Sequence, residues 1–405
     1  MKKSIPQKIY KVIMLVLITA FITFLLTTAF IYKRVTGTYL ASSGEKTTII
    51  STSKDTNLTK IIKEFKTILE NKYIGELDEE KMVEGAIKGY IEGVGDQYTT
   101  YLTKEEMQEL KEETDSKYVG IGVYVANYVE SNSILVMGVM NGSPALEAGI
   151  QAGDIIKKVN GVEYAGEELS KAVSVLKGEE GTEVTVTILR DEEEQDIKVV
   201  RKTIVVEHVA SNMLEENIGY IQIDSFDDGV AKSFEEKFNS LKDEGMKALI
   251  IDLRNNGGGV VKEATDLASM FSKKGETVLI TKDKEEKERK TLSNREPITN
   301  NMPVVVLVNG LTASASEILA GALRDNYGVK IVGNKTYGKG VIQTVYALSD
   351  GSGLKITTEE YFTPNHITIN NVGIEPDVEI GLTKDENDKD SQLSKAEELL
   401  KEQIK

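Results

Sequence analysis

The segment from Val12 to Tyr32 contains no charged residue. As an α-helix, a run of this length spans roughly 30 Å, which matches the hydrocarbon core of a bilayer. Four lysines precede the segment, at positions 2, 3, 8 and 11, whereas only Lys33 and Arg34 follow it closely. Because positive charge favours the cytoplasmic side, we predict an uncleaved single-pass anchor in the cell membrane, with residue 1 in the cytoplasm and the rest of the chain outside. A cleaved signal peptide is the alternative, but its apolar region is usually shorter than this one.

Charge and composition exclude several classes of function. The chain has 405 residues and a net charge of −16, with 49 basic and 65 acidic residues, and no long basic stretch. Nucleic acid is therefore not an expected partner, because the chain would repel the phosphate backbone. Cysteine is absent, so disulfides and thiolate nucleophiles are excluded. Two histidines, His208 and His366, are too few for a typical zinc site, and we expect neither a metal nor an organic cofactor.

Apolar periodicity predicts a small helical domain after the anchor. Helical spacing is present from Leu58 to Tyr73 and from Glu79 to Glu92, and Thr103 with Glu106 indicates a capping box at the start of a third helix. Strands are then predicted up to Thr203, with one helix between Glu167 and Lys177. The predicted organisation is cytoplasmic N-terminus and transmembrane anchor at 1–34, flexible linker at 35–56, helical domain at 57–115, β-rich domain at 116–203, α/β core at 204–381, and charged tail with an amphipathic helix at 382–405.

The core has the texture of an α/β domain. Buried strands are predicted at Ala248–Asp252 and Val304–Val308, each followed by a loop rich in glycine or serine. The tail carries an apolar stripe over residues 393–404, which predicts its amphipathic helix.

The β-rich domain contains a pattern typical of peptide recognition. Two glycines, Gly120 and Gly122, form a loop that leads at once into a strand, and Gly142-Ser143-Pro144-Ala145 and Gly153-Asp154-Ile155-Ile156 follow. This order resembles a PDZ domain of the bacterial protease type. The resemblance implies that Gly120, Ile121, Gly122 and Val123 bind the carboxyl end of an extended peptide with apolar last residues. Leu169, Val173 and Leu176 of the following helix are candidates for the pocket wall, although they fit an ordinary core equally well.

Ser314 is the first candidate for a catalytic group. It follows the strand Val304–Val308 and begins a helix, where free N–H groups and the helix dipole favour a developing oxyanion. Ser314 and Glu317 also form the Ser-x-x-Glu pattern of a capping box, which requires no catalysis. This segment alone therefore does not decide between a nucleophile and a helix cap.

A serine nucleophile needs a base, and the sequence offers Lys339. Lys339 lies between two glycines, and Gln343, four positions later, is able to orient its amine. To act near neutral pH, the pKa of Lys339 must fall by about 3 units, or roughly 4.6 kcal/mol, which burial is able to supply. His208 lies in a β-like run and His366 in a turn, neither with an evident carboxylate partner, so a Ser/His hydrolase is a weaker alternative. Residues Asn255–Gly259, after the strand Ala248–Asp252, are a candidate oxyanion-binding loop.

Together these segments resemble the C-terminal processing, or tail-specific, peptidase family. The matching blocks are Asp252-Leu253-Arg254-Asn255-Asn256-Gly257-Gly258-Gly259, Ser314-Ala315-Ser316-Glu317 and Tyr337-Gly338-Lys339-Gly340 with Gln343. The resemblance covers about residues 58–378, and Ser314 and Lys339 stand 25 positions apart (339 − 314), as in the family. Two departures, Gln97 after Gly-Asp and the segment His366–Asn371, concern loops outside the proposed dyad.

The resemblance implies a multi-domain α/β fold: a core related to crotonase and Clp protease, with an inserted PDZ domain that gates access to the active site. Its residue roles are as follows: Ser314 as nucleophile, Lys339 as general base, Gln343 as its orienter, the N–H groups of Ala315 and of Gly258 or Gly259 as oxyanion hole, and Glu317, Asp325 and Thr336 as supporting residues. The function implied is a serine endopeptidase that acts on proteins with accessible apolar C-termini. Signalling by regulated cleavage is one of the roles that fit such an enzyme. A catalytically silent PDZ scaffold is the alternative. The apolar stripes at 58–73 and 393–404 further suggest a homodimer.

Overall fold

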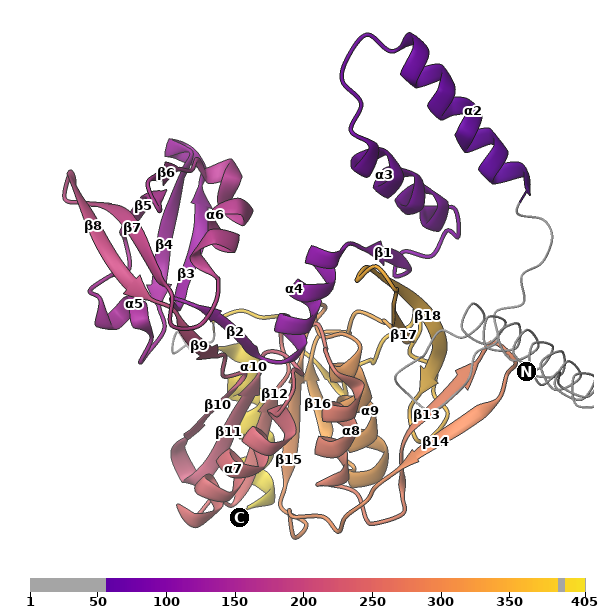
Figure 1. The fold of residues 1–405 in the computed structure, drawn as a ribbon. Coiled ribbons are helices and arrows are strands. Elements are labelled where there is room, and N and C mark those ends of the chain that lie inside the picture. The colour runs from indigo at the N-terminus through magenta and orange to yellow at the C-terminus, as the bar shows by residue number, and fades with distance from the viewer. Residues whose placement is uncertain (1–55, 385–389, 405) are drawn as a thin grey trace, which may run out of the picture. The chain divides into compact units, whose positions relative to one another are not determined.

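The computed structural model describes residues 56–384 and 390–404, which form two compact units (Figure 1). The first contains the residues up to Tyr101 together with 345–354, and the second contains 102–344 and the residues from Lys355 onward. The predicted anchor at 12–32, and the linker except for its last residue, lie outside the described residues. Within the described ranges, no helix combines the length and the apolar character needed to cross a bilayer.

The first unit is built around two helices, both confirming the sequence prediction. They are α2 (Thr56–Lys72) and α3 (Glu79–Glu92), and the short strand β1 (Thr100–Leu102) follows them. Asp78 caps α3 by accepting a hydrogen bond from the backbone N–H of Lys81. The two helices line an apolar cavity of about 700 Å³, and several of their large apolar side chains are exposed, including Phe65, Ile68 and Tyr90.

The second unit begins with α4 (Lys104–Thr114), whose capping box is the one that Thr103 and Glu106 predict. The antiparallel pair β2 (Lys117–Gly120) and β9 (Lys202–Val205) encloses the predicted PDZ domain in sequence. Its sheet has the order β3-β4-β5-β7-β8, with β6 beside β5. The strands are β3 (Val123–Tyr128), β4 (Ser133–Val139), β5 (Ile155–Val159), β6 (Val162–Glu163), β7 (Glu183–Arg190) and β8 (Glu193–Val200), and the helices are α5 (Pro144–Glu147) and α6 (Leu169–Leu176).

A six-stranded sheet of order β10-β11-β12-β15-β16-β19 forms the core, and all its pairs are parallel except β10–β11. The strands are β10 (Val209–Met213), β11 (Ile218–Ile223), β12 (Ala248–Asp252), β15 (Val304–Val308), β16 (Lys330–Gly333) and β19 (Val378–Glu379). Side chains alternate between two buried faces: Leu249 and Ile251 pack with α7 (Val230–Asp243), α8 (Val261–Ser269) and α9 (Ala315–Tyr327), whereas Ile250 faces the other way.

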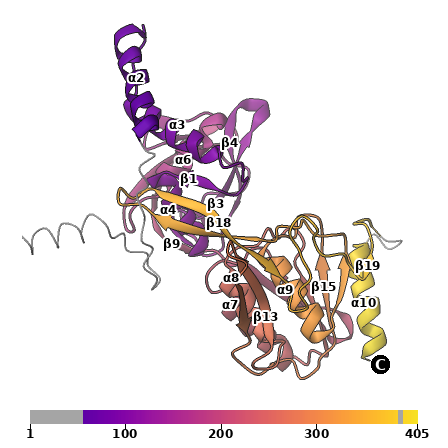
Figure 2. The ribbon, with the colours of Figure 1, turned by 90° about the vertical axis from the view of Figure 1, so that its right-hand side faces the viewer.

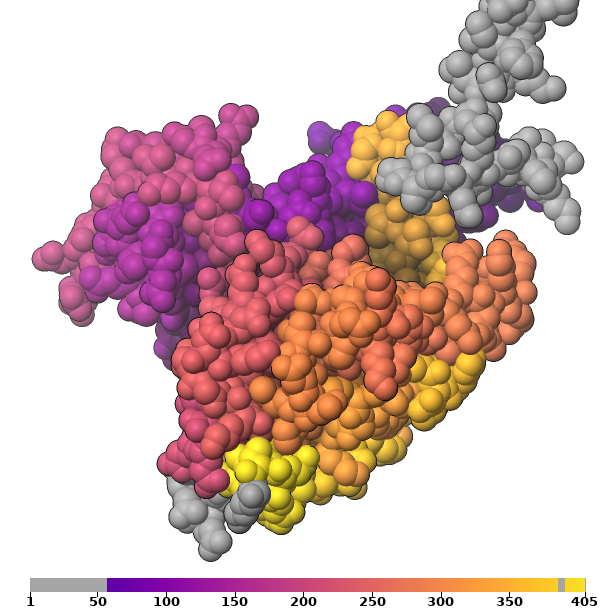
Figure 3. Space-filling view, turned by 90° about the horizontal axis from the view of Figure 1, so that it is seen from below, coloured from indigo at the N-terminus to yellow at the C-terminus, as the bar shows by residue number. Residues whose placement is uncertain are grey.

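The C-terminal helix α10 (Ser391–Gln403) covers the second face of this sheet. Figure 2 shows α10 on the side of β15 away from α9, and in Figure 3 the yellow C-terminal residues lie against the core. Ala396 and Leu400 are fully buried against Ile250 and Leu307. The apolar stripe of the tail helix is therefore used within its own chain, because the second face of a parallel sheet needs a cover.

A second sheet stands beside the core. It pairs β18 (Gly353–Phe362) with β13 (Thr277–Asp283), and β13 with β14 (Glu288–Leu292), while β17 (Val341–Ala347) pairs with β18. Tyr361 of β18 is fully buried in the main core, which brings this sheet to the end of the core where the loops after β15 and β16 lie.

Candidate active site

The candidate site forms where four neighbouring parallel strands end. The loops after β11, β12, β15 and β16 all leave the sheet at its carboxyl edge, where α/β sheets place their sites. Hydrogen bonds join the loops to one another: the N–H of Ala313 donates to the carbonyl of Asn256, and the N–H of Tyr337 donates to the carbonyl of Thr312. Segments far apart in sequence, around Gly258, Ser314 and Lys339, thus meet at one edge.

Ser314 sits at the sharp turn between β15 and α9 in a strained conformation. Its φ is 56° and its ψ is −117°, a region that non-glycine residues rarely occupy and that costs of order 1–3 kcal/mol. Its hydroxyl makes no cap hydrogen bond to the helix, while its backbone N–H donates to Glu317 Oε2 at 2.9 Å. The carboxylate half of the capping box is therefore formed, and the hydroxyl remains available for other chemistry.

Glu317 is fully buried and joins the serine turn to the lysine loop. Its Oε1 accepts hydrogen bonds from Thr336 Oγ1 at 2.5 Å and from the N–H of Gly338 at 2.8 Å, and its Oε2 accepts from the N–H of Lys339 at 3.0 Å and from that of Ser314. Burial raises the pKa of Glu317, although these hydrogen bonds oppose the rise. Thr336 in turn accepts from the N–H of Ile374 at 2.7 Å.

Lys339 lies in the loop after β16, half-buried. Burial lowers its pKa, the nearby charge of Lys355 lowers it further, and the charge of Glu317 opposes both. The hydroxyl of Tyr361 lies within hydrogen-bonding reach of the backbone carbonyls of both Ser314, at 3.1 Å, and Lys339. Glu317 and Tyr361 therefore hold the backbones of serine and lysine together from two sides.

The glycine loop packs directly on the serine turn. A Cβ on Gly258, whose φ is +108°, would stand 2.8 Å from the Cβ of Ser314 and 3.0 Å from the N of Ala315, so only glycine fits. The N–H of Gly258, however, is donated to Asn256 Oδ1 at 2.8 Å, while Gly259 forms a bridge with Phe226. Ala315 is the first residue of α9, so its N–H has no acceptor within the helix.

Two other predicted residues lie at the edges of this arrangement. Gln343 is on β17, where its amide nitrogen donates to Thr357 Oγ1 at 3.3 Å. Asp325 is near the end of α9 and accepts a hydrogen bond from the N–H of Asn365 at 2.9 Å, which fixes the turn after β18. The roles assigned to them by resemblance stay predictions.

The sequence interpretation of His208 is wrong in two respects. His208 lies in the break between β9 and β10, not within a strand, because the chain there passes from the PDZ domain to the core. It also has carboxylate partners: Nδ1 lies 2.7 Å from Asp224 and Nε2 lies 3.0 Å from Asp227. These two hydrogen bonds raise the pKa of His208 to about 9, so it is protonated at neutral pH and cannot serve as a base. His366 is also near a carboxylate, Glu288, at 3.3 Å.

The PDZ domain contains a small groove of about 80 Å³ between its glycine loop and α6. All four residues predicted to bind peptide line it, as do Val173 and Leu176, whereas Leu169 packs against the domain core. The side chain of Ile121 is buried in that core, which leaves its backbone for the groove. Lining residues also include Tyr118 and Lys177.

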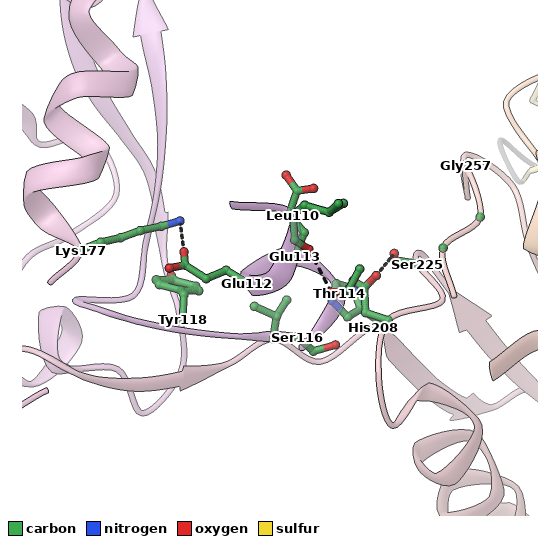
Figure 4. Close-up of a pocket in the computed structure, with 14 residues that line it drawn as sticks. Leu110, Glu112, Glu113, Thr114, Ser116, Tyr118, Lys177, His208, Ser225 and Gly257 are labelled. Carbon is green, nitrogen blue, oxygen red and sulfur yellow. Dashed lines mark hydrogen bonds and ion pairs between the residues drawn. The ribbon is translucent and has the colours of Figure 1, made fainter. Parts of the chain in front are cut away.

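A larger cavity of about 520 Å³ shares two lining residues with this groove and reaches the glycine loop. Tyr118 and Lys177 line it at one end and residues 257–259 at the other, with His208 and the end of α4 between them (Figure 4).

Sequence reasoning assigned no role to three residues that build the site. Asn256 anchors the glycine loop by donating from Nδ2 to the carbonyl of Ile223. Tyr361 bridges the loops that contain Ser314 and Lys339, and Phe226 pairs with Gly259. Only Asn256 had a local signal, since an Asn two positions before Gly predicts a side-chain turn.

Comparisons with known proteins agree with this architecture. Residues 217–380 match the model described as Peptidase family S41, residues 135–190 match the PDZ domain, and residues 17–106 match the Activating protease CtpB N-terminal domain. A probable CtpA-like serine protease of Staphylococcus aureus strain COL is 36% identical over 341 residues, covering 84% of this chain and 68% of the relative. One of Staphylococcus epidermidis is 37% identical over 331 residues, covering 81% and 66%.

Solved structures are also similar. A putative S41 protease from Bacteroides fragilis has a TM-score of 0.50 and 17% identity, covers 76% of this chain and 85% of its own, and shares the fold. The photosystem II D1 C-terminal processing protease is 29% identical, with a TM-score of 0.48, and covers 81% of this chain and 89% of its own.

Proposed function

Because this chain belongs to peptidase family S41 and is a serine protease of the C-terminal processing type, we propose that it is an endopeptidase that captures the carboxyl end of a protein in its PDZ groove and cleaves upstream with Ser314 and Lys339. One observation carries the assignment of the dyad. Glu317 and Tyr361 hold the backbones of these two residues together while burial lowers the pKa of the lysine.

In the proposed reaction, the neutral amine of Lys339 takes the proton of the Ser314 hydroxyl as its oxygen attacks the scissile carbonyl. The resulting ammonium gives the proton to the leaving amine, and an acyl-enzyme ester on Ser314 remains. Water, deprotonated by the same amine, then hydrolyses the ester. The lowered pKa of Lys339 supports this role because only the uncharged amine accepts a proton.

The oxyanion of the tetrahedral intermediate is assigned to the N–H of Ala315 at the start of α9. A second donor is expected from the glycine strip at 258–259. The N–H of Gly258 is bonded to Asn256, so its participation requires that bond to be exchanged for one to the oxyanion.

Replacing Lys339 with alanine tests the mechanism. We expect cleavage of an unstructured test protein to fall by at least about 10³-fold, because the variant lacks the proposed general base. Lys335→Ala is the matched control, since Lys335 is an exposed lysine four positions earlier, paired with Glu375 at 2.6 Å. Undiminished turnover in Lys339→Ala would refute the lysine base.

We further propose that residues 12–32 anchor the chain in the cell membrane with the catalytic part outside. The support is the uncharged run with lysines before it. In intact cells, added protease should digest the catalytic part and spare a tag on residue 1. Protection of both would reject this orientation.

A homodimer through the first unit is also proposed, supported by the exposed apolar side chains of α2 and α3. The stripe on α10 no longer supports pairing, because it is buried on its own sheet. Removal of residues 1–35 followed by light scattering should give a dimeric mass, and a monomeric mass would reject the proposal.

A further inference from the structure

Lys177 is one of two residues that the two cavities share. Lys177 is the C-cap of α6, and it lines both the PDZ groove and the cavity that leads to residues 257–259. Its Nζ is 5.4 Å from the centre of the Tyr118 ring, and Tyr118 is the other residue that lines both cavities. Among the described residues that line the groove, no other carries a positive charge, since the rest, apart from Tyr118, are glycine or aliphatic.

Lys177 is already paired with a residue from outside the PDZ domain. Its Nζ donates to Oε2 of Glu112 on α4 at 2.8 Å, and the two side chains are 33% and 24% exposed (Figure 4). Partial burial makes this pair worth more than a fully exposed one. Through this pair, α4 contacts the end of α6.

A peptide carboxylate at the glycine loop would compete for the same ammonium. The groove is only about 80 Å³, and Gly120, Gly122 and Lys177 all line it, so an anion held by the loop lies beside Lys177. One ammonium between two carboxylates leaves those two anions repelling each other. Binding of the terminal carboxylate therefore weakens the hold of Lys177 on Glu112.

We propose that Lys177 is a specificity-determining residue that pairs with the terminal carboxylate of the substrate, and that Glu112 is its internal competitor, released when the substrate arrives. This rests on the proposed function, because it assumes that the PDZ groove takes a protein C-terminus. Release of Glu112 frees α4 at a point close to the catalytic loops, since the carbonyl of Thr114 accepts from the N–H of Asp228 at 2.8 Å.

The experiment uses the full-length chain with Ser314→Ala, so that ligand is bound but not cleaved. Binding of one apolar-ended peptide is measured as the free acid and as the C-terminal amide. In this background we expect the acid to bind about ten-fold more tightly than the amide. Adding Lys177→Met should bring the two affinities within about two-fold of each other, whereas adding Glu112→Gln should tighten acid binding about three- to five-fold and leave amide binding unchanged.

The matched controls are Lys171→Met and Glu109→Gln. Lys171 lies on the same helix with its side chain 71% exposed, and Glu109 is an exposed residue of α4, and neither lines the groove. Opposite effects of the two test variants cannot both come from misfolding. A full acid preference in Lys177→Met, or unchanged acid binding in Glu112→Gln, would overturn the competition between Glu112 and the substrate carboxylate, but not C-terminal capture itself. No acid preference in the Ser314→Ala parent would overturn C-terminal capture as well.

Discussion

Replacing Glu317 with glutamine removes one acceptor oxygen from the centre of the site. Each carboxylate oxygen accepts two hydrogen bonds, from Thr336 and Gly338 on one side and from Ser314 and Lys339 on the other. The amide oxygen of the glutamine is best placed facing Ser314 and Lys339, where both donors are backbone N–H groups. The new NH₂ group then faces the N–H of Gly338, which loses its partner, while the hydroxyl of Thr336 is able to turn and accept.

An unsatisfied buried N–H costs about 1–3 kcal/mol, so the free energy of unfolding should fall by about that amount. For a core of this size, this corresponds to a fall in Tm of about 2–4 °C per kcal/mol. Glu263→Gln is the matched control. Glu263 is also a buried glutamate in the first turn of a helix, but it accepts a single N–H bond, from Ala231, which glutamine retains.

The same change has a distinct effect on the pH dependence of cleavage. Glu317 is the group whose charge raises the pKa of Lys339 against burial and Lys355. Without that charge, the pKa of Lys339 falls further. Because the proposed mechanism uses the uncharged lysine, kcat/KM should begin to rise at a lower pH in Glu317→Gln than in the parent, while Glu263→Gln leaves the profile in place. A profile that stays fixed or moves to higher pH would refute the electrostatic coupling, and an unchanged Tm would refute the hydrogen-bond argument.

Three further predictions concern the neighbouring loops. Gly258→Ala should lower kcat by at least about 10²-fold, because its Cβ would stand 2.8 Å from that of Ser314, whereas Gly257→Ala, with no heavy atom within 4 Å of its Cβ, should keep normal turnover in the same assay. The pKa of His208 is raised from 6.5 to about 9, so its contribution to folding stability is complete below about pH 6.5 and is lost as pH rises through about 9. After allowing for solvent screening of Asp224, His208→Asn should lower the free energy of unfolding by on the order of 1–2 kcal/mol at pH 6 and leave it unchanged above pH 10. Urea titration measures this, with His366→Asn as the control. Asp390→Asn should lower the free energy of unfolding by about 1 kcal/mol, because it breaks the pair with Arg254. Asp390→Ala should lower it by about 1 kcal/mol more, because it also removes the N-cap of α10, and equal losses in the two variants would contradict this contribution of the cap.

Much of the local structure follows from the sequence. The strands at Ala248–Asp252 and Val304–Val308 match their predicted bounds, because a strand buried on both faces is an uninterrupted apolar run that polar residues terminate. The capping box at Thr103 is equally local. The pairing of Ser314 with Lys339 as a dyad came from the resemblance and stays a prediction, because spacing alone could not have supplied it.

Contacts between distant segments could not be predicted in this way. Arg254 pairs with Asp390, 136 positions away, and Tyr361 reaches Ser314 from a different sheet. The carboxylates around His208 come from the loop after β11. The antiparallel pair of β10 and β11 brings this loop back beside His208. A residue-type pattern contains no signal for such pairs, because the fold and not the local chain brings them together.

The conformation of the glycine strip at 258–259 therefore depends on contacts with segments that are distant in the sequence. If Gly258 is the second oxyanion donor, as proposed, its N–H must leave Asn256, so the strip must shift, whereas the N–H of Ala315 needs no such change. The strip is paired with Phe226, whose N–H donates to the carbonyl of Gly258 at 2.9 Å. Phe226 lies in the same loop as Asp227 and Asp228, which bind His208 and the end of α4. If the proposed capture of a substrate C-terminus moves His208 or the end of α4, it therefore acts on the loop that packs against Gly258.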